Sequence, residues 1–367
     1  MQVAPIFVTM KKILLLLLLI PATLFAQENI SIGTKHHIQS ERLNEEREYW
    51  VYLPPKYDNK QYGKADYPVI YLLDGEQNFS LLVGIHQAFT RGLYNTMPES
   101  IIVGIVNTDR TRDFTPSNAS VMKGGKEAFT QSGGAENFTL FLQDEFMPQI
   151  EKEYRTNGYN ILIGHSFGGL FAINTLVHHT ELFNAYIALD PSLWWDNQKL
   201  YKEATAIWAN KDFKQRSLYV AMARKETKAK EKKEHGNTIE EFCKKLLPRS
   251  QKGNLNAMWK YYKEEDHGSI LTPGIFDALR NLFKGYTLPV KEIAQQPELI
   301  ESHLDALAKR LGHQFIADEV TIDRIGKHAA SVGETENARQ ILMYNLRNYP
   351  DSPNAKRSLD EVSKKQN

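Results

Sequence analysis

Between residues 30 and 288, short and largely apolar runs alternate with stretches whose apolar positions recur every three or four residues. The first pattern predicts β-strands and the second predicts α-helices. Repeated strand–helix–strand units predict an α/β fold with a mostly parallel sheet covered on both faces. The predicted strands span residues 49–53, 67–73, 101–106, 160–163, 185–189, 217–221 and 258–262, and the predicted helices span 79–92, 134–153, 168–178, 198–208, 238–247 and 273–285.

The pattern changes after residue 288, where strand signals stop and only helical spacing continues. Pro289 and Pro297 flank a short linker at this point. We therefore expect residues 27–288 to form the α/β domain and residues 296–367 to form a small, all-α C-terminal extension. Helices are predicted within that extension at 298–312, 318–332, 335–348 and 354–365.

Part of this helical tail resembles one tetratricopeptide repeat. Gly326 and Ala338 are small residues that would let two helices cross closely, and Pro350 would end the unit. Because one repeat cannot bury its own apolar face, we expect residues 296–367 to dock on the larger domain or on a protein partner. The alternative is a generic helical hairpin that covers a hydrophobic edge.

The N-terminus carries the pattern of a secretory signal peptide. Lys11 and Lys12 precede an unbroken aliphatic run at 13–20, and Ala26 is the small residue before a polar stretch. The pattern predicts that residues 1–26 are removed near Ala26, because the aliphatic run is too short to cross a bilayer. We expect a secreted or periplasmic protein without membrane association after cleavage.

Composition and charge then exclude several classes of protein. Hydrophobic residues make up 42% of the 367 positions and charged residues 24%, as in globular proteins. The net charge of +1 falls to −1 when a leader containing Lys11, Lys12 and no acid is removed, so nucleic acid is not an expected partner. The lone Cys243 cannot form an internal disulfide, and its helical context predicts a buried structural thiol.

The motif with most chemical content is Gly164-His165-Ser166-Phe167-Gly168. It follows a predicted strand and opens a predicted helix, which is the context of a nucleophile elbow. The flanking glycines leave room for a serine held in a strained backbone conformation. The turn would place the Ser166 hydroxyl at the carboxyl edge of the sheet, where reaction centres of such folds lie.

A serine nucleophile needs a base and a group that orients the base. His267 lies on the loop after the last predicted strand and is the expected base. Two acids fit the order serine, acid, histidine along the chain: Glu226 follows the sixth predicted strand, and Asp190 follows the fifth. We favour Glu226, because an Asp before Pro191 is more often a turn residue.

The developing oxyanion needs hydrogen-bond donors. The backbone N–H of Phe167, directly after the nucleophile, is one candidate. The second is expected on the loop after residues 67–73, from Glu76 or from Gly75.

Other side chains at the same edge of the sheet are candidates for contact with the substrate: Arg110, Arg112, Trp194 and Trp195. The arginines could bind an anionic group by forked hydrogen bonds. Alternatively, they pair with Asp109 and Asp113 to order their loop. The tryptophans form either an aromatic wall of the pocket or part of the core.

These residues together resemble the putative-esterase family of α/β-hydrolases, which includes esterase D and enterochelin esterase. The resemblance covers residues 30–288 and rests on segments 71–75, 110–116, 164–169, 191–195 and 266–269. It implies the α/β-hydrolase fold and hydrolysis of carboxylic esters by Ser166 and His267. Members of the family often have a glycine shortly before the acid, and here Ala221-Met222-Ala223 stands in that region.

The sequence therefore predicts a secreted serine esterase that acts on a small-molecule ester through a serine–acid–histidine triad and an acyl-enzyme. It predicts neither a metal site nor a cofactor, since no metal-ligand spacing or phosphate-binding loop occurs. One alternative is a periplasmic esterase of siderophore catecholate trilactones, because the arginine loop is similar to that of such family members. Others are an acyltransferase and a non-catalytic binding protein that uses its helical tail.

Overall fold

The computed structural model describes residues 30–92, 94–119, 129–224 and 230–364. The described residues from Gly33 onward form one compact unit. The predicted signal peptide, residues 1–26, lies outside the described residues.

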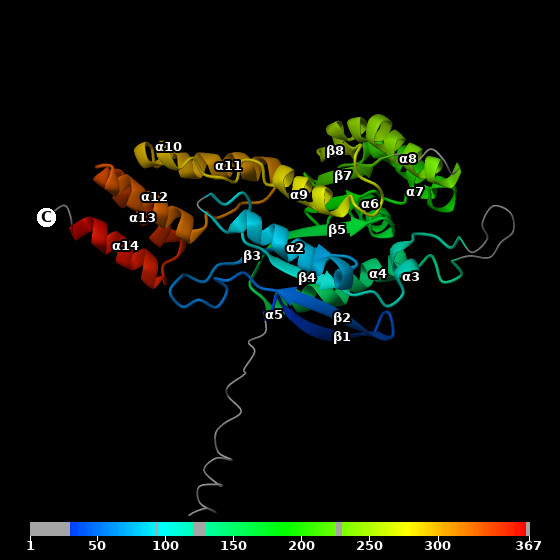
Figure 1. The fold of residues 1–367 in the computed structure, drawn as a ribbon, viewed down its shortest axis with the longest axis horizontal. Coiled ribbons are helices and arrows are strands. Elements are labelled where there is room, and N and C mark those ends of the chain that lie inside the picture. Colours follow the sequence, from blue (N-terminus) through cyan, green and yellow to red (C-terminus); the bar gives the residue numbers. More distant parts are fainter. Residues whose placement is uncertain (1–29, 93, 120–128, 225–229, 365–367) are drawn as a thin grey trace, which may run out of the picture. The chain divides into compact units, whose positions relative to one another are not determined.

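An eight-stranded sheet runs through the compact unit in the order β1-β2-β4-β3-β5-β6-β7-β8 (Figure 1). The strands β2 to β8 match the predicted positions, and β3 to β8 pair in parallel. This is the mostly parallel sheet of an α/β-hydrolase. The strands are β1 (Thr34–Ser40), β2 (Glu45–Tyr52), β3 (Tyr67–Leu72), β4 (Ile101–Ile105), β5 (Thr156–His165), β6 (Ala185–Leu189), β7 (Ser217–Ala223) and β8 (Asn256–Tyr262).

The edge strand β1 was not predicted. It pairs antiparallel with β2, which is itself antiparallel to β4. Most of its residues are exposed, and only Ile38 and Ser40 are buried. A strand at the edge of a sheet with one solvated face carries few apolar residues, so its sequence, Thr-Lys-His-His-Ile-Gln-Ser, gave no strand signal.

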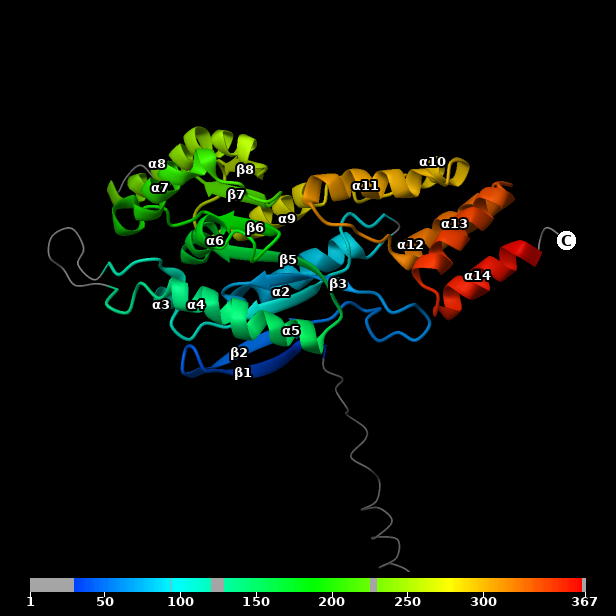
Figure 2. The ribbon, with the colours of Figure 1, turned by 180° about the vertical axis from the view of Figure 1, so that it is seen from behind.

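Helices cover both faces of the sheet. The helices α2 and α9 lie over one face in Figure 1, and α4, α5 and α6 lie over the other in Figure 2. Two separate clusters of buried side chains correspond to these layers, and the β-strands contribute to both. The helices of this part are α2 (Gly75–Thr90), α3 (Arg110–Phe114), α4 (Ala135–Phe141), α5 (Met147–Glu153), α6 (Phe167–His178), α7 (Trp195–Ile207), α8 (Lys230–Glu241) and α9 (Leu271–Leu282).

Two predicted helices contain a π-helical turn. Leu142–Phe146 separates α4 from α5, and Phe242–Leu246 follows α8. Cys243 lies in the second turn at 1% exposure, which confirms the predicted buried thiol, and burial raises its pKa. The short α3 was not predicted; its N-cap, Asp109, accepts a hydrogen bond from the N–H of Arg112.

The C-terminal extension folds into the four predicted helices and packs on the larger domain, and an unpredicted helix, α10 (Val290–Gln295), occupies the predicted linker. Leu307, Leu311 and Phe315 belong to the same buried cluster as α2 and α9. A Cβ added at Gly326 would lie 2.6 Å from the Cγ of Leu342, so α12 and α13 cross as closely as the small residue predicts. The likeness to a tetratricopeptide repeat stays a prediction. The helices are α10 (Val290–Gln295), α11 (Leu299–Leu311), α12 (Glu319–Ser331), α13 (Thr335–Asn348) and α14 (Pro353–Ser363).

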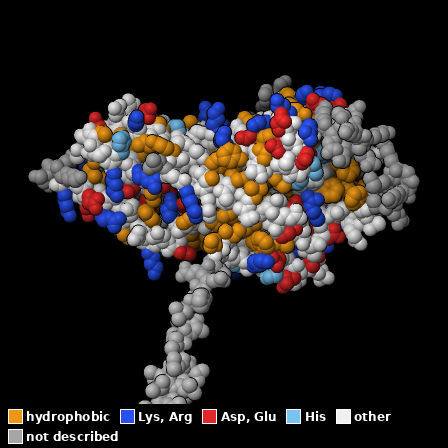
Figure 3. All heavy atoms as spheres, viewed as in Figure 1, with side chains coloured by type: hydrophobic (Ala, Val, Ile, Leu, Met, Phe, Trp, Pro, Cys, Tyr) orange, Lys and Arg blue, Asp and Glu red, His pale blue; other side chains and the backbone are white. Residues whose placement is uncertain are grey.

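On the face seen in Figure 3, basic and acidic side chains occur together, with small hydrophobic patches between them. Within the part of the chain that the structure describes, no helix is both long enough and apolar enough to cross a membrane.

The position of Phe315 gives a test of how the tail is held. Phe315 is 3% exposed and contacts the rings of Tyr159 and Phe283, whereas the neighbouring Ile316 is 55% exposed. We expect Phe315→Ala to lower the free energy of unfolding by about 3–5 kcal/mol, because it removes a core ring. Ile316→Ala is the matched control and should change it by less than about 0.5 kcal/mol. Denaturant unfolding measures both, and equal effects would contradict docking through Phe315.

Candidate active site

The backbone at Ser166 has the strained geometry of a nucleophile elbow. Ser166 has φ 59° and ψ −113° and stands between the end of β5 and the start of α6. A Cβ added at Gly164 would lie 2.2 Å from the carbonyl oxygen of Gly168, so only glycine fits there. The Ser166 N–H donates to the carbonyl of Leu189 on the neighbouring β6 at 2.9 Å. The elbow is thus fixed by close packing and by a bond across the sheet.

His267 lies within hydrogen-bond distance of the serine, as expected. Its Nε2 is 3.1 Å from the Ser166 Oγ. The loop that carries it is held by the Asp266 carboxylate, which accepts from the N–H groups of Gly268 and Ser269, each at 2.9 Å. A serine hydroxyl next to an imidazole is the arrangement that lets the imidazole take the hydroxyl proton.

The imidazole of His267 is oriented by Asp190, the second of the two acids that fit the chain order. The Nδ1 of His267 donates to the Asp190 Oδ2 at 2.6 Å. Glu226, our first choice from the sequence, lies outside the described residues. The position beside His267 Nδ1 that we had assigned to it is taken by the Asp190 carboxylate. Asp190 directly follows β6 and is also the turn residue that its position before Pro191 predicts, because its φ is 41°. This backbone conformation directs its carboxylate toward His267.

The Asp190 carboxylate is buried at 4% side-chain exposure and accepts several N–H bonds. His235 Nε2 lies 2.8 Å from the same Oδ2, and the Ala223 N–H donates to Oδ1 at 2.9 Å. Burial alone would raise the pKa of Asp190, but the hydrogen bonds from His235 and His267 outweigh it and hold this pKa well below its usual range. The carboxylate therefore stays ionised beside the imidazole.

The predicted oxyanion donors stand at the starts of two helices. Phe167 is the first residue of α6 and Glu76 is the second residue of α2, positions whose N–H groups have no partner within the helix. The loop before α2 lies against the elbow, because a Cβ added at Gly168 would be 3.4 Å from Leu73 and 3.6 Å from the Asp74 carboxylate. Gly75 packs on the backbone of β4, where an added Cβ would clash at 2.6 Å.

Both candidate arginines are engaged in ion pairs. Arg110 binds both carboxylate oxygens of Asp74, at 2.6 and 3.0 Å, and donates to the carbonyl of His165 at 3.1 Å. It therefore ties the loop before α2 to the elbow. Arg112 donates to Asp113 at 2.7 Å and to Glu45 at 2.6 Å. Its bond to Asp113 fits the alternative that the arginines order their own loop.

The two tryptophans have different surroundings. Trp195 is 1% exposed and donates from its indole N–H to the carbonyl of Ser117 at 3.1 Å, so it belongs to the core. Trp194 is partly exposed, and its ring centroid lies 6.2 Å from that of Phe167. Only Trp194 is placed to form a wall beside the nucleophile.

Three further polar residues that we had not assigned to the site lie there: Ser192, His165 and His235. Ser192 Oγ lies 3.2 Å from Ser166 Oγ. His165 Nε2 lies 2.7 Å from the His267 carbonyl oxygen, and burial lowers the pKa of His165 to about 4, so the neutral ring donates to that carbonyl. Ser192 and His165 lie within segments that we had singled out, but His235 lies in a charged run on α8 and reaches Asp190 only through the tertiary fold.

Among the described residues, Asp190, His235 and His267 form the group of potential metal ligands, with ligand atoms within 4.8 Å of one another. Both imidazoles are already hydrogen-bonded to the carboxylate, so this group is satisfied without an ion.

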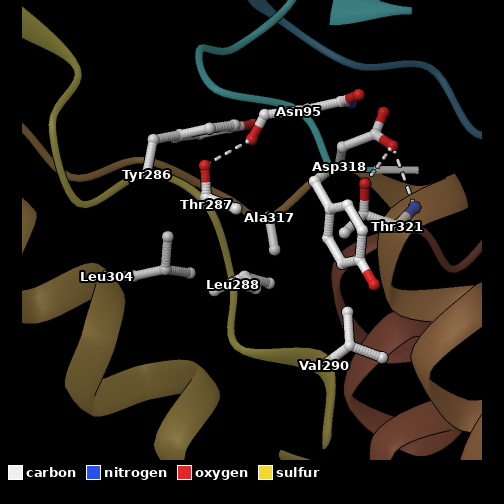
Figure 4. A pocket seen from close by; sticks show the side chains of 10 residues that line it. Asn95, Tyr286, Thr287, Leu288, Val290, Leu304, Ala317, Asp318 and Thr321 are labelled. Atoms are coloured by element: carbon white, nitrogen blue, oxygen red, sulfur yellow. Dashed lines mark hydrogen bonds between the residues drawn. The ribbon is translucent and has the colours of Figure 1, made fainter. Parts of the chain in front are cut away.

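A pocket occurs elsewhere, between the larger domain and the tail (Figure 4). Thr321 there donates to the Asp318 carboxylate, and Thr287 donates to the Asn95 carbonyl. None of its lining residues is paired as a nucleophile with a base, so it is not the reaction centre. It is lined by Tyr94, Asn95, Tyr286, Thr287, Leu288, Val290, Leu304, Ala317, Asp318 and Thr321.

The sheet order and the hydrogen-bonded serine, histidine and aspartate define an α/β-hydrolase with a serine nucleophile site. Residues 40–264 match the family described as "Putative esterase", and the chain belongs to this family. It is a carboxylic ester hydrolase, and the non-catalytic alternative is thereby excluded.

Relatives of known name are esterases of siderophores. The chain is 29% identical over 266 residues to the ferri-bacillibactin esterase BesA of Bacillus subtilis, covering 68% of this chain and 89% of the relative. It is 30% identical over 166 residues to a siderophore enterobactin esterase of Emericella nidulans, covering 39% of this chain and 54% of the relative. The chain is thus a serine esterase of the siderophore-esterase type.

A solved structure of an IroE-like serine hydrolase from Shewanella oneidensis is similar over more of the chain. The identity is 33% and the TM-score is 0.78, covering 86% of this chain and 99% of the other. Residues 1–288 make up less than 86% of the 367 residues, so the match must include part of the helical tail. Part of the tail therefore has a counterpart in the Shewanella structure.

The position of Asp190 leads to a prediction that separates the two acids. We expect Asp190→Asn to lower kcat by about 10³- to 10⁴-fold, because an amide no longer stabilises the protonated imidazole. Asparagine tolerates the positive φ, so the backbone should be preserved. Glu226→Gln should retain activity within about threefold. Steady-state hydrolysis of an activated ester measures both, and the reverse order would return the role to Glu226.

Proposed function

We propose that this chain hydrolyses the ester bonds of a siderophore through a covalent acyl-enzyme on Ser166. The observation that carries this proposal is the continuous hydrogen-bonded series Ser166 Oγ, His267 and Asp190, with separations of 3.1 and 2.6 Å. Such a series supplies a nucleophile, a proton acceptor and a fixed negative charge at one edge of the sheet.

The reaction then proceeds in two halves. Ser166 Oγ attacks the ester carbonyl while His267 Nε2 takes its proton, and Asp190 stabilises the imidazolium that forms. The N–H groups of Phe167 and Glu76 donate to the oxyanion. His267 returns the proton to the leaving alcohol, and the acyl group stays on Ser166. A water molecule, deprotonated by His267, then releases the acid and restores the serine.

Two features support a siderophore as the substrate rather than a simple ester. The named relatives act on ferri-bacillibactin and enterobactin. In addition, partly exposed aromatic rings lie next to the nucleophile: Phe167 is within 6.1 Å of Phe129 and 6.2 Å of Trp194, measured between centroids. Such a surface can stack on the aryl rings of a catecholate ester.

A test compares substrates and removes the nucleophile. Wild-type protein should react with a fluorophosphonate probe and cleave a ferric catecholate trilactone at least about tenfold faster, in kcat/KM, than a p-nitrophenyl ester. Ser166→Ala should lose labelling and lower kcat by about 10⁴-fold or more. Liquid chromatography of the hydrolysis products measures cleavage. Labelling without trilactone cleavage would retain the esterase and reject the siderophore, and an active Ser166→Ala would reject the mechanism.

We also propose that the protein is exported, on the basis of the basic pair, aliphatic run and Ala26 near its N-terminus. The expected result is a mature protein that begins at Gln27. Intact-mass measurement of protein made with its own leader in a bacterial host, with separate analysis of the periplasmic fraction, checks this. A full-length cytoplasmic product would contradict export.

A further inference from the structure

We infer that His235 is a positioning residue for catalysis, which keeps the Asp190 carboxylate aimed at His267. This inference rests on the proposed function, because it concerns how the base of that reaction is oriented. It assigns a role to α8, a helix that contributes none of the residues of the serine–histidine–aspartate series.

The first observation is that two imidazoles share one carboxylate oxygen. His235 Nε2 and His267 Nδ1 lie 2.8 and 2.6 Å from Asp190 Oδ2. The two rings are nearly perpendicular, at 85°, with centroids 5.2 Å apart. A carboxylate oxygen has two lone pairs, so Oδ2 can accept both N–H bonds at once.

The second observation concerns the hydrogen bonds of the His235 ring. Its Nδ1 is buried and has no hydrogen-bond partner among the described residues. Its Nε2 bonds to Asp190 Oδ2 at 2.8 Å. This bond to the carboxylate therefore orients the ring, and through it His235 acts as a donor to Asp190.

The third observation is the difference in exposure between the two histidines. His267 has a side-chain exposure of 46%, compared with 17% for His235 and 4% for Asp190. The base must be accessible to substrate, so its bond to Asp190 is open to competition by water. The less accessible bond from His235 keeps the carboxylate in one orientation while His267 gains and loses its proton.

Removal of the His235 donor should therefore act on the chemical step rather than on substrate binding. We expect His235→Phe, which keeps a ring but donates nothing, to lower kcat by about 10- to 100-fold, the usual effect of one lost hydrogen bond to a charged group. KM should stay within about twofold. His235→Gln places an amide N–H near the original Nε2 and should restore kcat to within about fivefold of wild type.

His179→Phe is the matched control. His179 also bonds through Nε2 to a carboxylate, that of Glu136 at 2.9 Å, and has a similar side-chain exposure of 19%, but it lies at the far end of α6 from Ser166. The kcat and KM of the His179→Phe variant should equal those of the wild-type protein. Thermal unfolding of each variant identifies any loss of folded protein.

A double-mutant cycle with Asp190→Asn decides whether His235 acts through the carboxylate. If it does, His235→Phe should change the residual kcat of Asp190→Asn by less than about twofold, because the group that it orients is gone. An undiminished effect in that background, or full activity of His235→Phe alone, would overturn the inference. Failure of wild-type protein to label or to hydrolyse any ester would instead overturn the proposed function, so the two failures are distinguishable.

Discussion

The ionised carboxylate of Asp190, buried where strands β6 and β7 end, is the constraint on which the arrangement of the site depends. An unpaired buried charge costs several kcal/mol, and this one is tolerated because N–H groups of Ala223, His235 and His267 all point at it. Each donor comes from a different element: β7, α8 and the loop after β8. The requirement to satisfy one anion therefore fixes the mutual placement of elements distant in sequence.

The same logic applies on the other side of the nucleophile. Asp74 is 3% exposed, and its carboxylate is paired by Arg110, which also bonds to the carbonyl of His165. The loop before α2 is thereby tied to the elbow by a charged pair and by the packing of Leu73 on Gly168. Two buried carboxylates, each with its own cation or imidazole partners, thus hold the base and the candidate oxyanion donors against a rigid Ser166.

Two kinds of feature made parts of this site predictable from the sequence: motifs of neighbouring residues, and the order in which site residues follow the parallel strands. The elbow could be found because glycine spacing, strand and helix are adjacent in the chain, and His267 because parallel strands fix the order of residues along an edge. The choice between Glu226 and Asp190 could not be made this way. Both follow strands, and the positive φ that turns Asp190 toward the imidazole is a property of the folded chain.

His235 and β1 were missed for a related reason. His235 lies among lysines and glutamates, a composition typical of a solvated helix face, and only the packing of α8 against the ends of β6 and β7 brings it to the carboxylate. The polar β1 is a strand because β2 offers it an unpaired edge. Sequence periodicity indicates which apolar positions a segment buries, whereas β1 buries only Ile38 and Ser40 and the His235 side chain is a partly buried polar group.

The tail contacts the larger domain at a distance from the nucleophile, which favours a role in stability. Phe315 packs on Tyr159 near the start of β5, whereas Ser166 follows the end of that strand. At about 3.3 Å per residue, the two points are separated by roughly 20 Å along the strand. The tail also supplies Asp318 as a partner of Lys56, beside Glu99, whose pKa burial raises to about 7 despite the neighbouring Lys56. A surface that buries aromatic rings and charged groups in this way is an integral domain interface, and it contacts both β5, the strand that leads to Ser166, and the buried cluster that contains α2.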